Sequence, residues 1–366
     1  MSIKYIPLTV KNKTTLTPES ASFELEIPDD KKDLFSYKPG QYIGIRVVLN
    51  KIEFRREYSL CSSPYLNEPL SFAAKYINSG IVSKYLVKDL TPGETLEVLP
   101  PRGKFSPDLN PENFKVYFLI AGGSGVTPML SIVKSVLKVE EHSKVILYYG
   151  NYSENDIMFR KELDELSREH PNKFFKFYTL ENYDLNWKGQ KGKINVHDLG
   201  RIINDYRSTE INANEFYICG PLPMMDLAKD EIKKWNIPDS KINIEFFTPP
   251  VPEVNDKKEI DSVEPDITDE IPDAVHDRQV KITLDNEDYN ITVKPTQTIL
   301  EAAMDAGLDP PYSCRSGICT TCRAKLFSGK VKMDEREGLS DAEIEEGYIL
   351  TCQSHPLTND VSLEYM

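Results

Sequence analysis

Four cysteines near the carboxyl end of the chain have the spacing of metal-cluster ligands. Cys314, Cys319 and Cys322 follow the pattern C-x4-C-x2-C, and Cys352 lies further downstream. This is the ligand pattern of a plant-type [2Fe–2S] cluster, in which soft thiolates suit iron and offset the ferric charge. A structural zinc site or a disulfide pair are the alternatives, but a zinc ribbon normally shows two C-x2-C pairs. The spacing therefore predicts an iron–sulfur electron carrier.

Two short motifs nearer the amino end have the chemistry of a flavin site. The segment Arg56-Glu-Tyr58-Ser59-Leu60 lies in a strand-like stretch, and Gly80-Ile-Val82-Ser83 opens a helix predicted to run to Leu90. An arginine offers phosphate oxygens a fixed fork of donors, and the first N–H groups of a helix attract a diphosphate. A tyrosine ring can lie against a flavin, and a serine can hydrogen-bond it. Either motif alone could be an ordinary strand or helix start, whereas both in this order predict a flavin site.

A glycine-rich turn in the middle of the chain has the chemistry of a dinucleotide site. The apolar run Val116–Ala121 is followed by Gly122-Gly123-Ser-Gly125-Val-Thr127-Pro128. We predict a helix over Ser131–Val139 and a further strand over Lys144–Tyr149, which together make a βαβ unit of a doubly wound sheet. Glycine lets the backbone approach a pyrophosphate, and the helix start that follows binds its charge.

A fourth candidate site is Cys219-Gly220-Pro221, directly after the apolar strand that begins at Phe216. Open α/β sheets bind ligands at the carboxyl ends of their strands, so these residues stand where a nucleotide would bind. A buried structural role is the alternative for Cys219, since isolated cysteines are usually buried. Cys61, beside the Arg56 motif, is most simply a core residue.

Composition limits the remaining possibilities. The 366 residues are enough for two or three domains, and 40% hydrophobic with 28% charged residues is ordinary for a globular protein. A net charge of −14 argues against nucleic acid or an anionic membrane as a partner. It fits a partner protein that has a basic docking face, and it fits a purely solubilising role equally well. We find no apolar run that could span a membrane and no signal peptide, which predicts a cytoplasmic protein with reduced thiols.

The distribution of strands, helices and turns predicts a multidomain chain. Residues 1–110 read as short strands of an antiparallel β-barrel that binds flavin, and residues 111–248 as a doubly wound α/β domain that binds NAD(P). Residues 249–278 are rich in Pro, Asp and Glu and read as a linker. Residues 279–366 read as strands around a helix capped by Thr298, the order of a β-grasp ferredoxin domain.

The motifs of residues 1–248 resemble those of the ferredoxin–NADP reductase family, and residues 279–366 resemble plant-type ferredoxins. The order of the three parts resembles that of the oxygenase reductases, a group that includes the reductase subunit of phenylacetyl-CoA epoxidase. This resemblance implies an oxidoreductase with FAD, rather than FMN, and a [2Fe–2S] cluster. It also implies electron transfer from NADH or NADPH to a protein acceptor, a di-iron oxygenase component of phenylacetate catabolism or a related monooxygenase.

The resemblance also implies roles for single residues. Cys219 and Ser59 would lie at the site of hydride transfer, Cys219 beside the nicotinamide, and Phe247 would cover the flavin. The cluster ligands would be Cys314, Cys319, Cys322 and Cys352. The full set of residues expected to bind flavin or nucleotide is Arg56, Tyr58, Ser59, Leu60, Lys75, Gly80, Val82, Ser83, Gly123, Gly125, Thr127, Pro128, Ser153, Gly220, Pro221 and Phe247.

Two questions stay open at this level. The acceptor could instead be a desaturase, another hydroxylase or a hybrid-cluster protein, and the chain could be a stand-alone diaphorase or redox sensor. NADH is weakly favoured over NADPH, because Tyr152 and Leu180 stand where NADPH-using relatives often place basic residues. Ser153 and Lys193 remain as possible partners of a 2′-phosphate.

Overall fold

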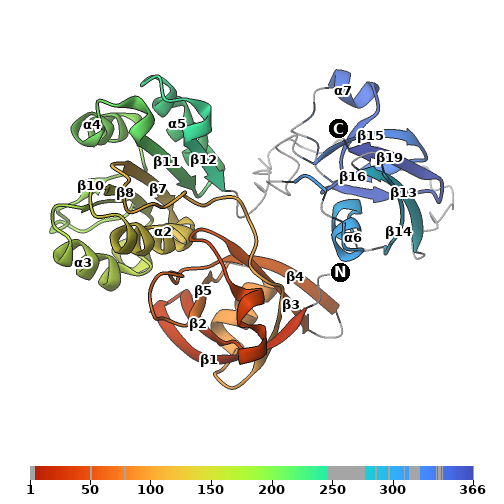
Figure 1. The fold of residues 1–366 in the computed structure, drawn as a ribbon, viewed down its shortest axis with the longest axis horizontal. Helices are drawn as coiled ribbons and strands as arrows, with labels where there is room; N and C mark the ends of the chain where they lie inside the picture. The colour runs from red at the N-terminus through yellow and green to blue at the C-terminus, as the bar shows by residue number, and fades with distance from the viewer. Residues whose placement is uncertain are drawn as a thin grey trace, which may run out of the picture. The chain divides into compact units, whose positions relative to one another are not determined.

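The structure, a computed structural model, describes most of the chain in two compact units. The described residues are 5–49, 52–77, 80–245, 277–284, 287–295, 297–308, 310–312, 322–334, 336, 339 and 341–365. Those up to 245 form one unit and those from 277 onward form the other (Figure 1). The predicted linker, 249–278, lies outside the described residues except for its last two.

The first part of the first unit is an antiparallel sheet of six strands. These are β1 (Ile6–Thr17), β2 (Ser20–Glu26), β3 (Tyr42–Leu49), β4 (Ile52–Ser59), β5 (Leu70–Lys75) and β6 (Thr95–Val98). They pair in the order β4-β3-β6-β1-β2-β5. The two outermost strands in this order, β4 and β5, also meet. An isolated antiparallel β-bridge joins Leu60, directly after β4, to Phe72 of β5. The sheet is therefore barrel-like, as the alternating strands predicted.

Alternate residues of these strands fill the interior of the barrel. Phe23 of β2 and Phe72 of β5 are fully buried, and their rings stack with centroids 4.9 Å apart. The predicted helix after Gly80 consists of a short α1 (Ile81–Lys84) and a wider turn, η2 (Tyr85–Asp89). The wider turn closes where the N–H of Leu90 donates to the carbonyl of Tyr85 at 2.8 Å.

The second part of the first unit is a parallel sheet covered by helices on both faces (Figure 1). Its strands are β7 (Val116–Gly122), β8 (Lys144–Asn151), β9 (Phe174–Leu180), β10 (Gln190–Lys191), β11 (Asn214–Cys219) and β12 (Ile242–Glu245). They pair in the order β10-β9-β8-β7-β11-β12, all parallel. The helices are α2 (Val126–Val139), α3 (Arg160–Glu169), α4 (Val196–Tyr206) and α5 (Leu222–Lys233).

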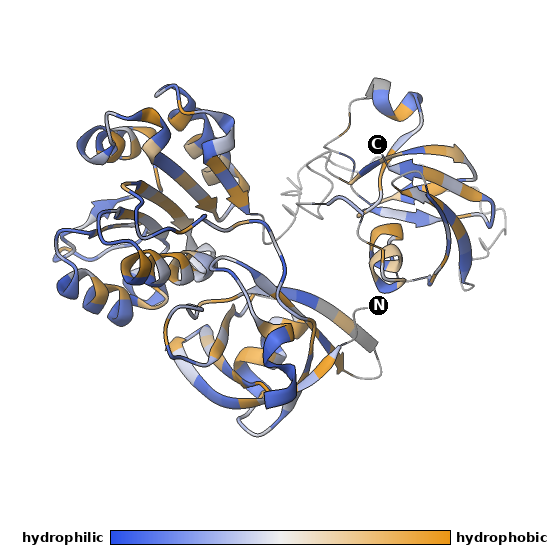
Figure 2. Cartoon of the chain, in the orientation of Figure 1, coloured by the Kyte–Doolittle hydropathy of each residue, from blue (hydrophilic) through white to orange (hydrophobic). Residues whose placement is uncertain are grey.

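Hydrophobic residues of the central strands form two cores, one on each side of this sheet. Every residue of β7 is buried, which is typical of a parallel strand covered on both faces. Figure 2 shows hydrophobic residues along the strands, and hydrophilic as well as hydrophobic residues on the surrounding helices. The order of strands and helices confirms the predicted doubly wound fold.

The prediction that the first helix of this sheet begins at Ser131 is wrong. Helix α2 begins five residues earlier, at Val126, directly after the glycine-rich turn. Pro128 did not prevent this, because it occupies the first turn of the helix, where a proline ring costs no intrahelical hydrogen bond. The helix amino end therefore lies within the glycine-rich motif itself.

The second unit is a mixed sheet packed on one main helix. Its five-stranded sheet has the order β14-β13-β19-β15-β17, in which β13 (Arg278–Leu284) and β19 (Val361–Tyr365) are parallel. The other strands are β14 (Glu287–Val293), β15 (Arg323–Ser328) and β17 (Tyr348–Leu350), and β16 (Val331–Met333) pairs with β18 (Ser354–Pro356). The helices are α6 (Ile299–Asp305) and α7 (Asp341–Glu345).

The start of α6 confirms the cap read from the sequence. The Thr298 hydroxyl accepts a hydrogen bond from the Glu301 N–H at 3.2 Å, and the Glu301 carboxylate accepts one from the Thr298 N–H at 3.1 Å. This capping box satisfies two backbone donors that a helix end leaves unpaired. None of the helices in the described part of the chain is both long and apolar enough to cross a membrane.

Candidate functional site

The glycine-rich turn lies at the carboxyl end of β7, where parallel sheets bind ligands. Gly123 has a φ of 53°, and a side chain added there would meet no atom within 4 Å, so its outer face is open. At Gly125, in contrast, an added Cβ would lie 2.1 Å from the carbonyl oxygen of Cys219. One glycine thus leaves room for a ligand, and the other lets the turn pack against the end of β11.

Cys219 ends β11 and is fully buried between two neighbouring strands. Its register partners are Ala121 of β7 and Glu245 of β12. Burial, together with the nearby Glu245 carboxylate, raises the pKa of the Cys219 thiol well above its usual range. The thiol is therefore protonated and uncharged at neutral pH.

Glu245, a residue that we did not single out from the sequence, lies at the end of the last described strand of this sheet. Burial raises its pKa to about 8, and the charge of Glu57 adds to the effect. At pH 7 Glu245 is therefore largely a neutral carboxylic acid, which can donate a hydrogen bond. The sequence around it, Ile242-Asn-Ile-Glu245, contained no signal beyond a carboxylate at a strand end.

The effect of Glu57 on Glu245 also shows which elements meet at this site. Glu57 lies on β4 between Arg56 and Tyr58, in the predicted flavin motif, whereas Glu245 is at the nucleotide end of β12. A carboxylate can act on another in this way only at short range. Together with the ring contact of Phe105 and Tyr217, whose centroids lie 5.2 Å apart, this effect indicates that the barrel packs beside β11 and β12.

The residues of the flavin motif differ in how they are exposed. Arg56 is exposed, Tyr58 is partly buried and Ser59 is buried, while Leu60 packs entirely into the barrel core. Burial raises the pKa of Tyr58, which keeps its hydroxyl protonated. The exposed guanidinium of Arg56 fits a flavin phosphate, and the partly buried ring of Tyr58 fits the flavin ring. Because the Leu60 side chain is in the core, only its backbone could contact a flavin.

The Gly80 motif forms a tight loop closed by its own serine. The Ser83 hydroxyl accepts from the N–H of Ile77 at 3.2 Å and donates to the carbonyl of Gly80 at 3.2 Å. Val82 is buried in the barrel core. The side chains of this motif thus serve the loop, and only its backbone is left for a diphosphate. Its role in binding stays a prediction.

Arg102 is a further candidate that the sequence did not single out. Its Nη2 donates to Glu57 at 3.0 Å, its guanidinium lies 5.8 Å from the centre of the Tyr42 ring, and its buried Nε has no partner. A buried donor without an acceptor is costly. An anionic ligand beside β3 and β4 would satisfy it, so the donor set here fits the flavin predicted for the barrel.

A second orphaned group lies at the nucleotide end of the parallel sheet. Asn151, the last residue of β8, is only 6% exposed, and neither its Oδ1 nor its Nδ2 has a hydrogen-bond partner. It follows Gly150, the register partner of Gly122, and the neighbouring Tyr149 hydroxyl donates to the Gly123 carbonyl at 2.9 Å. A group that offers both a donor and an acceptor, such as a ribose hydroxyl, would satisfy this amide. The site therefore fits a dinucleotide.

Lys75 and Ser153, both predicted to bind a cofactor, meet at one carboxylate. Lys75 of β5 lies 3.3 Å from Asp156 Oδ1, and the Ser153 hydroxyl donates to Asp156 Oδ2 at 2.6 Å. Burial opposes ionisation of Asp156, but Ser153 and Lys75 outweigh it and lower the pKa. The three residues join the barrel to the loop after β8.

Other predicted nucleotide residues lie on the same edge. Thr127 is buried, and its hydroxyl donates to the Ser124 carbonyl at 2.8 Å, while Pro128 is buried in α2 and Pro221 caps α5. Gly220 has a φ of 156°, and a Cβ added to it would lie 2.8 Å from the backbone nitrogen of Gly122. Leu180, which stands where NADPH-using relatives often place a basic residue, is fully buried in the core together with residues of α2 and α3.

A buried lysine joins the two parts of the first unit. Lys134 of α2 is 6% exposed and lies 3.0 Å from Glu68 of the barrel and 3.1 Å from Glu162 of α3. Two hydroxyls of α2 reinforce the contact, since Ser131 donates to the Ser62 carbonyl at 2.6 Å and Ser135 lies 2.8 Å from the Ser63 hydroxyl. This interface fixes the segment that follows the Arg56–Leu60 motif against α2.

In the second unit the described cluster residues are Cys322 and Cys352, both buried. The backbone N–H and the hydroxyl of Thr351 donate to the Cys322 carbonyl at 3.2 and 3.0 Å, so the two cysteines lie on neighbouring segments. They pack with Leu300, Leu339 and Leu350 in a small apolar cluster. Two thiols brought together in an apolar setting fit a buried cluster. Cys314, Cys319 and Phe247 lie outside the described residues.

Comparison with known families matches all three parts of the chain. Residues 7–106 match the oxidoreductase FAD-binding domain, and residues 119–230 match the oxidoreductase NAD-binding domain. Residues 282–357 match the 2Fe-2S iron-sulfur cluster binding domain. These matches confirm the predicted cofactors.

Relatives match nearly the full length. The chain is 32% identical over 361 residues to a subunit of the 1,2-phenylacetyl-CoA epoxidase of Escherichia coli, covering 98% of this chain and 97% of the relative. It is 31% identical over 359 residues to the ferredoxin reductase component of 3-ketosteroid-9-alpha-monooxygenase of Rhodococcus rhodochrous, with 98% and 96% covered. The solved structure of phthalate dioxygenase reductase has the same fold, with a TM-score of 0.62, 24% identity and 98% of both chains covered.

Proposed function

The chain belongs to the family of FAD-, NAD- and [2Fe–2S]-binding reductase components of oxygenase systems, and from this premise we propose that it reduces the oxygenase component of phenylacetyl-CoA epoxidase or a related monooxygenase. The acceptor would be a di-iron protein. The relatives support an oxygenase as acceptor, although they serve several different ones. The cysteine usage supports a cytoplasmic location, where thiols stay reduced.

The observation that carries the proposal is the packing of the barrel on the nucleotide domain, through the Lys134–Glu68 ion pair at 3.0 Å and the ring contact of Phe105 with Tyr217 of β11 at 5.2 Å. Nucleotide and flavin must lie against each other for hydride transfer, and Glu57 of the flavin motif is close enough to Glu245 to raise its pKa. A bound flavin would supply a two-electron acceptor for the hydride of the nicotinamide, and a bound cluster would supply a one-electron carrier. The polypeptide itself would position the nucleotide, the flavin and the cluster for these transfers.

The groups around the nicotinamide position would be uncharged. The Cys219 thiol is fully buried and its pKa is raised, and Glu245 is protonated below about pH 8. A charged carboxylate here would attract the oxidised, cationic nicotinamide and slow its release, whereas a neutral acid can hydrogen-bond the carboxamide. We assign Cys219 and Glu245 to orienting the nicotinamide ring, with Ser59 facing it from the end of β4.

The other residues would hold the ends of the two cofactors. The open face of Gly123 and the amino end of α2 suit the nucleotide pyrophosphate, and Arg56 with Arg102 suits the flavin phosphates. Cys314, Cys319, Cys322 and Cys352 would ligate the cluster. Together these residues fix the distances over which electrons pass, which is the protein's share of the catalysis.

A fragment that ends at residue 248 tests the proposed division of labour, because it leaves out the predicted linker and the second unit. We expect it to retain flavin and to reduce ferricyanide with NADH or NADPH, since ferricyanide can take electrons from the flavin. It should lose the reduction of cytochrome c and of the oxygenase component. Adding residues 279–366 as a separate protein should restore the activity only at high concentration, because a tether supplies an effective concentration of about millimolar.

The outcome for the natural acceptor separates the alternatives. If the fragment reduces the oxygenase component as fast as the intact chain, the cluster is not on the electron path. If the intact chain reduces ferricyanide but no di-iron oxygenase component, a desaturase, another hydroxylase, a hybrid-cluster protein or a stand-alone diaphorase role takes the place of the proposed one.

A further inference from the structure

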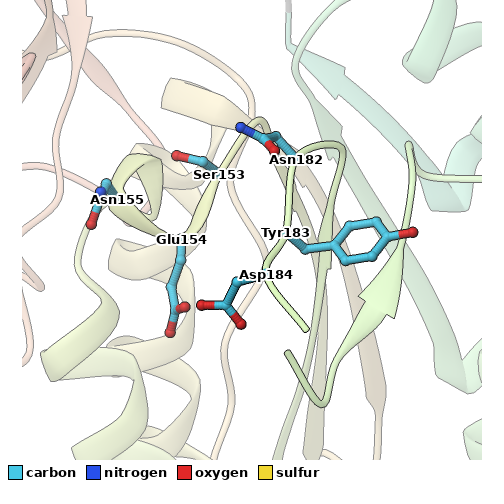
Figure 3. A pocket seen from close by; sticks show the side chains of 6 residues that line it. All are labelled: Ser153, Glu154, Asn155, Asn182, Tyr183 and Asp184. Carbon is cyan, nitrogen blue, oxygen red and sulfur yellow. The ribbon is translucent and has the colours of Figure 1, made fainter. Parts of the chain in front are cut away.

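A small pocket lies between two neighbouring loops at the carboxyl edge of the parallel sheet. It has a volume of about 330 Å³ and is lined by Ser153, Glu154, Asn155, Asn182, Tyr183 and Asp184 (Figure 3). The first loop follows β8 and the second follows β9. Backbone hydrogen bonds tie the loops together, from Glu181 N–H to the Asn151 carbonyl at 3.1 Å and from Asn182 N–H to the Tyr152 carbonyl at 2.6 Å.

The position of this pocket identifies the part of a dinucleotide that would reach it. In a doubly wound sheet the pyrophosphate lies at the helix that follows the first strand, here β7 and α2. The adenosine ribose then lies over the end of the second strand, here β8, where an acidic residue commonly binds its 2′-hydroxyl. The loops after β8 and β9 are on that side of the glycine-rich turn, because the strand order runs β9-β8-β7.

The pocket presents negative charge. Its lining includes two carboxylates, Glu154 and Asp184, which Figure 3 shows pointing toward each other from opposite loops, and none of its lining residues is basic. Two basic groups close by are already in ion pairs, while a third, Lys191, lies 4.9 Å over the ring of Tyr183 and is not itself a lining residue. Arg160 lies 2.5 Å from Glu154, and Lys193 lies 3.7 Å from Glu181.

The hydroxyl best placed to receive a phosphate is also occupied. Ser153 donates its proton to Asp156 at 2.6 Å, and the same carboxylate accepts the Ser153 backbone N–H at 3.2 Å. Asp156 is held in turn by Lys75 of the barrel. Neither donor of Ser153 is therefore left for a 2′-phosphate, and of the two partners suggested by the sequence only the ion-paired Lys193 remains.

We propose that this pocket receives an unphosphorylated ribose, so that Glu154 and Asp184 make the chain selective for NADH over NADPH. The proposal rests on the proposed function, since it concerns the same nucleotide. Carboxylate oxygens accept hydrogen bonds from ribose hydroxyls, whereas a 2′-phosphate would bring up to two further negative charges close to both of them. Repulsion of this kind at a solvated site lowers NADPH turnover by about tenfold or more.

The test is the steady-state reduction of ferricyanide by the purified full chain, measured with NADH and with NADPH. We expect kcat/KM for NADH to exceed that for NADPH by at least about tenfold at low salt. The ratio should fall as ionic strength rises, because salt screens charges at an open pocket. A purely steric exclusion would leave the ratio independent of salt.

The double variant Glu154→Gln with Asp184→Asn removes both charges and frees Arg160. It should raise kcat/KM for NADPH about tenfold and change that for NADH much less. The matched control, Glu141→Gln with Glu169→Gln, removes two exposed carboxylates outside the pocket and should leave the ratio unchanged.

The results separate this proposal from the function on which it rests. Ferricyanide reduction with equal kcat/KM for both nucleotides, or a double variant with the wild-type ratio, overturns the role of the pocket and leaves the reductase function standing. If neither nucleotide supports ferricyanide reduction, the proposed function itself fails.

Discussion

In the first unit the residues of the site come from strands far apart in the sequence, whereas in the second they come mainly from one loop. Glu57 lies on β4, Cys219 on β11 and Glu245 on β12, and they meet only because two sheets pack together. Three of the four predicted cluster ligands are close in sequence, from Cys314 to Cys322, and the hydrogen bonds of Thr351 bring Cys352 near Cys322. The first site is built by long-range packing and the second by local chain geometry.

The difference matches what each site must do. A nucleotide enters and leaves in every turnover, so its site must lie at an open edge between two layers. A cluster stays in place and needs only a closed loop of thiolates. Changes in the second unit should therefore affect electron exit alone, while changes at the interface of the first unit should affect its stability and electron entry.

The largest expected effect is on electron exit. Cys352→Ser removes a predicted cluster ligand, so reduction of cytochrome c and of the oxygenase component should fall to background. Ferricyanide reduction should stay within about twofold of wild type, because the flavin site belongs to the other unit. Iron analysis and both assays check this. Cys61→Ala, which changes a buried cysteine of the first unit, should keep its iron. Retention of full oxygenase reduction by Cys352→Ser would remove that residue from the ligand set.

A large effect on stability is expected at the interface of the first unit. Burial disfavours the charge of Lys134, but Glu162 and Glu68 outweigh it and raise the pKa. Lys134→Met leaves these carboxylates without their buried partner and should cost about 3 kcal/mol. Calorimetry should show a lower melting transition for the first unit and an unchanged one for the second. A shift of both transitions together would mean that the units unfold as one.

The pH dependence of stability should show the raised pKa of Glu245 in the first unit. Because the pKa of Glu245 is about 4.5 in the unfolded chain and about 8 in the fold, the folded state retains the proton to higher pH. Stability therefore falls as the pH rises from about 4.5 to 8. Glu245→Gln, which stays neutral, should match wild type near pH 4 and be more stable by about 5 kcal/mol above pH 8, because each unit of the pKa shift corresponds to about 1.4 kcal/mol.

Glu215, on the neighbouring strand β11, provides a control of opposite sign. Burial disfavours its charge, but hydrogen bonds and ion pairs with Lys115 and Lys241 outweigh it and lower the pKa. Its stabilisation is present above about pH 4.5 and is lost as the pH falls through the folded pKa. Glu215→Gln should therefore be less stable than wild type at pH 7 and equal to it in acid. Urea unfolding at several pH values measures both variants, and parallel pH profiles for the two would contradict the assignment.

The smallest expected effect is local to the second unit. Thr298→Ala removes the hydroxyl that caps α6 and should cost about 1 kcal/mol in that unit alone. Thr298→Ser keeps the hydroxyl and should be nearly neutral. Thermal unfolding of the full chain compares them, and equal transitions for the Ala and Ser variants would show that the capping box does not stabilise α6.

The sequence by itself determined the features that depend on a few consecutive residues. The capping box of Thr298 and Glu301 needs only one helical turn, and the run of buried residues in β7 needs only one strand. The cysteine spacing and the flavin and nucleotide motifs are equally local, so the three kinds of cofactor followed from them, as the family matches confirm. Even the early start of α2 was a local matter, since the first turn of a helix tolerates Pro128.

Only the tertiary structure decided what depends on strand register and on the packing of one layer against another. Nothing near Glu245 in the sequence shows that Cys219 and Glu57 will surround it, and the sequence could not show that Leu180 faces the core. The pairing of Lys134 with Glu68 and the facing carboxylates of Glu154 and Asp184 likewise join separate segments. A pKa or an ion pair depends on distances of a few ångströms, and between distant segments those distances are set by the fold as a whole.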